Sequence, residues 1–272
     1  MNMKNNYPRK IICLTEEPVE WLYLLGEEWR IAGVSCYVKR PAEAKKHPVT
    51  SAFTHANLKK IISMNPDLVI GHSDIQKDIA RDLVASGTNV YIANHRSLDE
   101  TLDYLLFLGR MVEKEQKAIE LVSKYKTKIE YYRQLSSQLN RFPKVYLEEW
   151  DEPMISGIRY FSEVFRAIGA RDIFGDISDR GILGKDRVIE WDRVRELDPD
   201  IYLSCWCGKA LELESVKQRQ GWSEMKFSKS NMIFELQPEI FLQPGPALFE
   251  DGLDYAYSII KKWSEYDSVS SK

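Results

Sequence analysis

The chain has 272 residues, a hydrophobic fraction of 44% and a formal net charge of −3. This length admits one large domain or two of ordinary size. The slightly acidic balance argues against a nucleic-acid-binding protein, which needs a basic surface. No stretch approaches the run of about 18 apolar residues that a transmembrane helix requires.

The first residues lead into an apolar strand without the long apolar run of a secretory signal. The sequence as written therefore predicts a cytoplasmic protein, and a periplasmic or cell-surface protein if an export signal has been removed. Four cysteines in a chain of this size do not indicate a disulfide scaffold.

The first part of the chain alternates short apolar runs with helical patterns. The predicted strands are residues 10–14, 31–35, 67–70 and 89–93. The predicted helices are a segment that opens at Pro18 and ends near Gly26, and residues 58–64 and 75–86. Such alternation predicts a parallel sheet covered by helices on both faces. Residues 36–57 are predicted to form a long loop, which is more often functional than idle when it carries aromatic residues such as Tyr37 and Phe53.

From residue 97 to about residue 140 the apolar residues follow helical spacing, with no proline and only Gly109 as a breaker. We expect a long helix here, with a possible break at residues 109–113, that joins two lobes. An ordinary surface helix would show the same pattern.

The second half of the chain repeats the order of strands, turns and helices predicted for the first half. A lysine, an apolar strand, an acidic turn and a proline occur at residues 10–18 and again at 144–153. The turn at residues 198–200 corresponds to the turn at 65–67, and the predicted strand 231–235 corresponds to the predicted strand 89–93. A helix over 160–169, a helix over 188–197, a rigid turn at 243–246 and a final helix over 248–263 complete the pattern.

These patterns predict an α/β protein of two similar lobes with mostly parallel sheets flanked by helices, joined by a long interlobe helix. The expected divisions are an N-terminal lobe at 1–97, a linking helix at 98–140 and a C-terminal lobe at 141–272.

Two strand ends are the candidate binding positions. One strand runs into His72 and Ser73, and another runs into Trp206, which Cys205 and Cys207 flank. Ligands bind at the carboxyl ends of strands in open α/β sheets, so we expect a cleft between the lobes. The side chains expected to line it are mostly uncharged and rich in rings: Tyr37, Phe53, His72, Ser73, His95, Trp150, Arg159, Trp206 and Gln243. Such a wall suits a large planar ligand, although Trp206 could instead belong to the core.

Catalytic motifs are absent from the sequence: it has no glycine-rich phosphate loop and no Gly-x-Ser-x-Gly elbow. The acidic run at residues 148–152 could hold an acid–base pair, but acidic turns more often serve capping and solvation. His72 and His95 could meet Cys205 and Cys207 as a zinc or iron site. Free thiols are the simpler interpretation of the two cysteines.

The chain resembles the cobalamin and iron–siderophore substrate-binding proteins of ABC importers over roughly residues 9–263, and most closely their cobalamin-binding branch. The segments that carry the resemblance are residues 33–35, 65–70, 149–157, 205–208 and 243–246, together with the strand–helix order and the long helix.

The resemblance implies a monomeric, non-catalytic protein that holds a cobalamin-like or other metal-chelate ligand in the interlobe cleft, with no covalent cofactor. Ring stacking would be supplemented by hydrogen bonds from Ser73, Arg159 and Gln243. His72 could contact a corrin edge or coordinate cobalt, or act as a structural hydrogen bonder. An ABC permease is the implied partner, and Asp78 is the acidic residue of the first lobe that could meet it. The alternative function is a cytosolic metal-dependent enzyme or metal chaperone that uses His72 with Cys205 or Cys207.

Overall fold

The computed structural model describes residues 7–270, with side chains described as far as residue 269. Within this range the chain is an α/β protein that forms two compact units. Unit 1 comprises residues up to His95, Asp99–Lys124 and Gln243–Ala247, and unit 2 comprises Arg96–Leu98, Tyr125–Leu242 and the residues from Leu248 onward. The expectation about an export signal concerns first residues that lie mostly outside the described range, and the division at residues 97 and 140 stays a prediction.

Unit 1 is built on a five-stranded sheet in the order β3-β2-β1-β4-β5, and every neighbouring pair in it is parallel. Its strands are β1 (Ile11–Cys13), β2 (Ile31–Ser35), β3 (Val49–Ser51), β4 (Leu68–His72) and β5 (Val90–Ala93). The central strand β1 is buried throughout. The parallel arrangement brings the carboxyl ends of all five strands to one edge of the sheet.

Helices cover the sheet of unit 1, because the apolar side chains of its strands must be shielded from water. Pro18 occupies the first turn of α1 (Glu17–Leu25), where its missing N–H costs nothing, and Gly26 ends the helix in the left-handed region at φ 75°. The other covering elements are α2 (Leu58–Ser63), η3 (Asp74–Gln76) and α3 (Lys77–Ala85), with η1 (Glu28–Arg30) and η2 (Ala42–Lys46) in the connections. One hydrophobic cluster joins sheet and helices: Ile12, Leu14, Ile61, Val69, Ile79 and Leu83.

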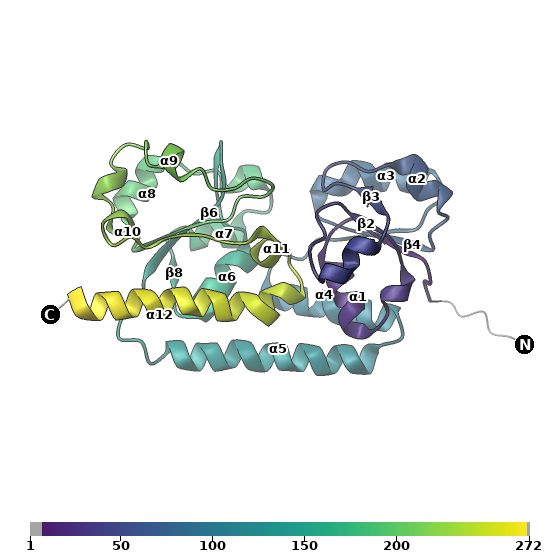
Figure 1. Cartoon of the computed structure of the whole chain (residues 1–272), viewed down its shortest axis with the longest axis horizontal. Helices are drawn as coiled ribbons and strands as arrows, with labels where there is room; N and C mark the ends of the chain where they lie inside the picture. The colour runs from purple at the N-terminus through teal and green to yellow at the C-terminus, as the bar shows by residue number, and fades with distance from the viewer. Residues whose placement is uncertain (1–6, 271–272) are drawn as a thin grey trace, which may run out of the picture. The chain divides into compact units, whose positions relative to one another are not determined.

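The long helical segment is confirmed as two helices, α4 (Leu98–Met111) and α5 (Glu115–Ser136). The interruption falls at the predicted position, because Glu113 adopts φ 60°. Helix α5 begins in unit 1 and ends in unit 2. In unit 2, Tyr125 and Tyr132 of α5 donate hydrogen bonds of 2.7 Å to Glu250 and Asp254. This half of α5 therefore packs alongside η6 (Leu248–Gly252) and α12 (Leu253–Ser270). Figure 1 shows α5 running beside α12.

Unit 2 is built on a sheet in the order β10-β9-β6-β7, with β8 paired to the start of β6. Its strands are β6 (Lys144–Asp151), β7 (Met154–Ser156), β8 (Arg171–Asp172), β9 (Ile201–Ser204) and β10 (Ile233–Glu235). Only β7 runs antiparallel to its neighbour among the pairs described. The remaining elements are α6 (Arg159–Ala167), α7 (Gly175–Arg180), η4 (Gly184–Arg187), α8 (Trp191–Leu197), α9 (Leu213–Val216), η5 (Trp222–Glu224), α10 (Lys226–Lys229) and α11 (Pro238–Phe241).

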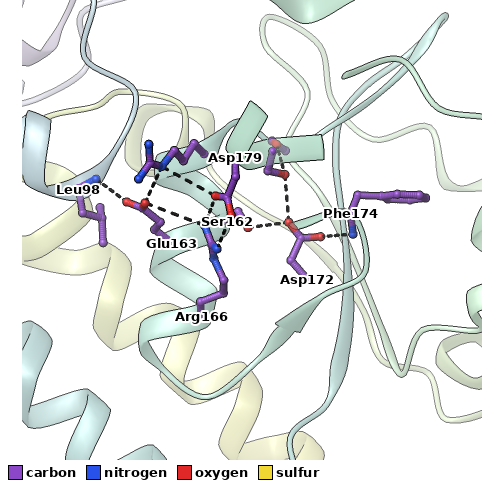
Figure 2. Close-up of polar contacts among 10 residues, drawn as sticks. Leu98, Ser162, Glu163, Arg166, Asp172, Phe174 and Asp179 are labelled. Carbon is purple, nitrogen blue, oxygen red and sulfur yellow. Dashed lines mark hydrogen bonds and ion pairs between the residues drawn. The ribbon is translucent and has the colours of Figure 1, made fainter. Parts of the chain in front are cut away.

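A polar network fixes α6 against its surroundings in unit 2 (Figure 2). The buried Asp172 carboxylate accepts hydrogen bonds from the Ser162 and Ser178 hydroxyls at 2.6 and 3.1 Å and from the Phe174 N–H at 2.9 Å. Burial nevertheless raises the pKa of Asp172. On the same helix, Glu163 accepts from the Leu98 N–H at 2.7 Å and so satisfies a free donor at the start of α4.

Three local predictions were wrong. Residues 36–57 are not a structureless loop, since they contain η2 and the edge strand β3, whose mixed Val-Thr-Ser sequence gives no alternation signal. The acidic residues 148–151 are not a turn but the end of β6, and the turn falls at Glu152 and Pro153 before β7. The helix predicted from residue 188 starts at Trp191, because Val188 pairs with Ile155 in an isolated bridge. None of the helices in the described range is long and apolar enough to cross a bilayer.

Candidate functional site

In unit 1, His72 and Ser73 stand at the carboxyl end of β4, as the sequence predicted. The His72 backbone N–H donates to the side-chain carbonyl of Gln76 at 2.9 Å. Ser73 has φ 65°, a region that non-glycine residues seldom adopt, and its hydroxyl accepts from the Ile75 N–H at 3.3 Å. A strained residue held by its neighbours is common where a chain presents groups to a ligand.

A ring cluster lies behind His72. The imidazoles of His72 and His95 meet edge to face at 4.6 Å, and His95 stacks on Tyr104 at 4.4 Å. His72 Nε2 lies 3.2 Å from the His95 carbonyl oxygen, and His95 Nε2 lies 2.8 Å from the Pro244 carbonyl oxygen. Both rings are buried. These bonds favour the structural role that the sequence left open for His72.

The other predicted residues of unit 1 differ in exposure. Tyr37 is 44% exposed after β2, and Phe53 is half-buried, with its carbonyl accepting from the Gln76 side chain at 2.9 Å. Gln243 is half-buried in the segment 243–247 that joins this unit. Unit 1 thus holds Tyr37, Phe53, His72, Ser73 and Gln243.

A buried acid lies at the carboxyl end of β1, unforeseen from the sequence. Glu17 Oε1 accepts from the Thr15 hydroxyl at 2.7 Å, while Oε2 has no hydrogen-bond partner among the described residues. Burial raises the pKa of Glu17 to about 8. It also raises the pKa of the Cys13 thiol beyond its ordinary range, and the nearby Glu17 carboxyl adds to that effect. Glu17 is therefore mostly protonated at neutral pH.

In unit 2, the buried Glu148 is the centre of a hydrogen-bond network. Its carboxylate accepts from the hydroxyls of Tyr146 and Tyr202 at 2.7 and 2.9 Å and from the Trp206 indole N–H at 3.1 Å. Arg219 adds two donors at 2.6 and 3.0 Å. Strand alternation explains the gathering, since Tyr146 and Glu148 share one face of β6, and Tyr202 is on the same face of β9.

The Glu148 network holds Trp206, which lies beside a second group of side chains. Trp206 is 3% exposed, and Trp150 is half-buried with its indole N–H donating to the Glu152 carbonyl at 3.0 Å. The Lys209 ammonium lies 4.7 Å from the Trp150 ring centre and 4.8 Å from that of Trp206. It also lies 2.7 Å from each carboxylate oxygen of Asp151. We call Trp150, Trp206 and Asp151 the tryptophan cage.

A pocket of about 550 Å³ opens beside the cage, with Asp151 in its wall. Its lining mixes apolar side chains with the carboxylates of Asp151, Glu152 and Glu190. The full lining is Asp151, Glu152, Pro153, Met154, Val188, Ile189, Glu190, Trp191, Ser215, Val216, Gln218 and Arg219. Such a volume can hold a small organic group.

Arg159, the remaining predicted residue, starts α6, and its Nε donates a hydrogen bond to Glu163 at 2.8 Å and forms an ion pair with Asp179 at 3.8 Å. Unit 2 thus holds Trp150, Arg159 and Trp206. The role of all eight predicted residues in ligand binding stays a prediction.

The proposed metal triad gains no support. His72 belongs to unit 1, whereas Cys205 and Cys207 belong to unit 2. Among the residues whose side chains are described, no three His, Cys, Asp or Glu residues are grouped so as to hold a metal ion. Cys205 is buried, and burial raises the pKa of its thiol well above the ordinary range.

Sequence reasoning missed Arg219 and Lys209, and it placed Glu148 in an acidic turn rather than at the centre of a buried network. A signal for Glu148 existed, because it directly follows the predicted apolar strand and lies two residues after Tyr146, and a carboxylate that is buried needs donors. Lys209 directly follows the segment 204–208. Nothing in the sequence ties Arg219 to Glu148, 71 residues away.

Comparisons with known proteins agree with this architecture. An uncharacterized ABC transporter substrate-binding lipoprotein of Bacillus subtilis is 24% identical over 261 residues, which are 93% of this chain and 80% of that protein. A vitamin B12-binding protein of Vibrio vulnificus is 27% identical over 175 residues, 62% of this chain and 63% of the relative.

A crystal structure described as a possible iron-binding (periplasmic solute-binding) protein from Staphylococcus epidermidis has the same fold. The TM-score is 0.78, with 24% identity over 93% of this chain and 99% of that one. The sequence profile of one family extends over both sheets and matches residues 11–240. The chain therefore belongs to the periplasmic binding protein family.

Proposed function

We propose that the protein is the substrate-binding component of an ABC importer and that it binds a cobalamin-like or other metal-chelate ligand without changing it chemically. The observation that carries this proposal is the placement of ring-bearing side chains at the carboxyl ends of strands in both units. His72 ends β4 and Ser73 follows it, while Trp150 is next to the last residue of β6 and Trp206 follows β9.

The chemistry of these residues supports a large, flat ligand. Aromatic faces bury much ligand area at little entropic cost, and fixed side chains reduce the ordering that binding requires. Hydrogen bonds to the Glu148 carboxylate and to the His95 carbonyl oxygen hold Trp206 and His72 in place. The name of the Vibrio vulnificus relative adds support for a corrinoid.

A permease partner and a location outside the cytoplasmic membrane follow from the same proposal. Asp78, the acidic residue expected to face a permease, is in the first turn of α3 with a side chain that is 67% exposed. It pairs with Arg81 at 2.9 Å, a contact that a permease arginine could replace.

The test is a binding experiment with a coloured ligand. The purified protein is incubated with cyanocobalamin, with hemin or with a ferric siderophore, and is then desalted. We expect one of these to co-elute near equimolar amounts, seen by its absorption. Trp150→Ala should weaken binding about tenfold or more, because it removes a stacking face. Trp29→Ala is the control, since this exposed tryptophan precedes the amino end of β2.

Elemental analysis of the same samples provides the opposing result. Protein that retains none of the three ligands but carries stoichiometric zinc or iron would overturn the proposal and restore the metal-chaperone alternative. Equal binding by Trp150→Ala and Trp29→Ala would leave ligand binding intact but remove Trp150 from the site.

A further inference from the structure

The surroundings of Lys209 are those of a bound ammonium ligand. Its Nζ is within 5 Å of two tryptophan ring centres and 2.7 Å from the oxygens of Asp151. Two indole faces and a carboxylate are the groups with which proteins recognise amines and quaternary ammonium ions. The chain thus fills with its own lysine a site whose chemistry suits a cationic ligand.

The two indole rings of the tryptophan cage are held by hydrogen bonds that do not involve Lys209. The indole N–H of Trp206 donates to the buried Glu148, and the indole N–H of Trp150 donates to the Glu152 carbonyl. These bonds hold both rings whether or not Lys209 is present. The two aromatic walls of the cage are therefore preorganised, which lowers the cost of binding a replacement cation.

The segment that carries Lys209 is attached more loosely than the cage. Residues 207–210 are exposed, and Gly208 adopts φ 85° with no atom within 4 Å of the position a Cβ would take. The Lys209 side chain is itself 38% exposed. Its withdrawal would uncover the cage without removing a buried side chain from the core.

We propose that Trp150, Trp206 and Asp151 form a binding site for an ammonium group, and that Lys209 occupies this site until an amine-bearing ligand displaces it. A cationic ligand replaces Lys209 one for one, and it regains both ring faces and the carboxylate. An anionic ligand attracted by Lys209 would have to compete with Asp151 at 2.7 Å and would gain neither ring.

The lining of the pocket beside the cage also favours a positively charged ligand. Asp151 in its wall is paired with Lys209, and Arg219 is paired with Glu148. Glu152 and Glu190 add negative charge to the lining. The body of an amine-bearing ligand could extend from the cage into this pocket of about 550 Å³. That the transported ligand carries the amine rests on the proposed function; the ammonium site itself does not.

The test uses butylammonium, which reproduces the end of a lysine side chain, as a probe in ligand-observed NMR titrations. Lys209→Ala should bind butylammonium about tenfold or more tightly than the unmodified protein, because the internal competitor is gone. Lys209→Gln is a second variant that empties the cage with a polar side chain. Lys217→Ala is the matched control, because Lys217 pairs with the exposed Glu214 and is in the same unit.

Two further measurements define the chemistry. n-Butanol, which has nearly the same shape without the charge, should not bind Lys209→Ala measurably. Adding Asp151→Asn to Lys209→Ala should weaken butylammonium binding about tenfold, since the carboxylate is lost. Circular dichroism confirms that each variant is folded.

Equal affinity of the unmodified protein and both Lys209 variants would overturn the proposal. So would equal binding of butanol and butylammonium, or full binding without the Asp151 carboxylate. Because the probe is a simple amine, these outcomes do not depend on whether cyanocobalamin or another chelate binds.

Discussion

Glu148 and Arg219 form a bidentate ion pair, with N–O distances of 2.6 and 3.0 Å, in the interior of unit 2. The pair connects β6 to the segment that follows α9. Burial opposes the charge of Arg219, but the hydrogen bonds to Glu148 prevail and raise the pKa of the guanidinium. Arg219 in turn lies 5.2 Å from the Trp191 ring centre.

Glu148→Gln should destabilise unit 2 by about 3–5 kcal/mol, because it leaves Arg219 buried without a counter-charge. Urea unfolding followed by circular dichroism measures the change. Glu214→Gln, which breaks an exposed pair with Lys217, should change stability by less than about 1 kcal/mol. Similar small losses in both variants would mean that the buried pair adds little.

Trp206→Ala should lower the free energy of unfolding by about 3–5 kcal/mol, because it empties a buried volume and removes a donor from Glu148. Trp150→Ala should cost less, since Trp150 is only half-buried. Thermal denaturation of the two variants gives the comparison. A Trp206 variant with unchanged stability and lost ligand binding would assign this ring to the ligand alone.

Glu17 should make stability fall with rising pH. Its folded-state pKa is about 8, against 4.5 for the ordinary group, so between these values the folded state retains a proton that the unfolded state loses. The stabilisation is complete below about pH 4.5 and is lost by the time pH passes about 8.

Glu17→Gln should abolish this dependence, so that the variant resembles the unmodified protein at pH 5 and exceeds its stability by a few kcal/mol at pH 9. Urea unfolding at both pH values tests it, with the exposed Glu43→Gln as control. Parallel pH profiles for Glu17→Gln and the unmodified protein would show that the carboxyl does not titrate as its burial implies.

Asp172→Asn should destabilise unit 2 by about 1–3 kcal/mol, because an amide keeps one acceptor oxygen where Ser162, Ser178 and Phe174 supply three donors. The melting temperature measures the loss. Asp176→Asn, at an exposed position of α7, is the control. If the two variants melt together, the network in Figure 2 contributes little to stability.

The sequence predicted the elements whose signals are local. The strand ends at His72 and Trp206 follow Pro-Asp turns and short apolar runs, and the interruption near Glu113 follows a helical pattern. Strand β3 was not predicted, because its three residues of mixed polarity at a sheet edge show no alternation of apolar and polar side chains. The β6–β7 hairpin was not predicted, because an acidic residue such as Glu148 is typical of a turn. In the fold, five hydrogen-bond donors from other side chains satisfy its carboxylate within the strand.

The residues of the candidate site also fall into those with a local sequence signal and those without one. Trp150 and Trp206 could be named from the sequence because both are rings at the end of a predicted strand. Lys209 could not be assigned to the cage, since its ammonium reaches Asp151 across 58 residues of sequence. Contacts of that kind depend on how β6 and β9 pair, which no single segment encodes.

The loop that carries Lys209 determines how strongly this lysine competes with an added amine. A lysine attached to the chain competes at an effective concentration fixed by the length and stiffness of its loop. Lengthening the loop at Gly208 would lower that concentration and so strengthen the apparent binding of every amine, with no change to a residue that touches it. The loop is thus a control on affinity that can be adjusted separately from the walls of the site.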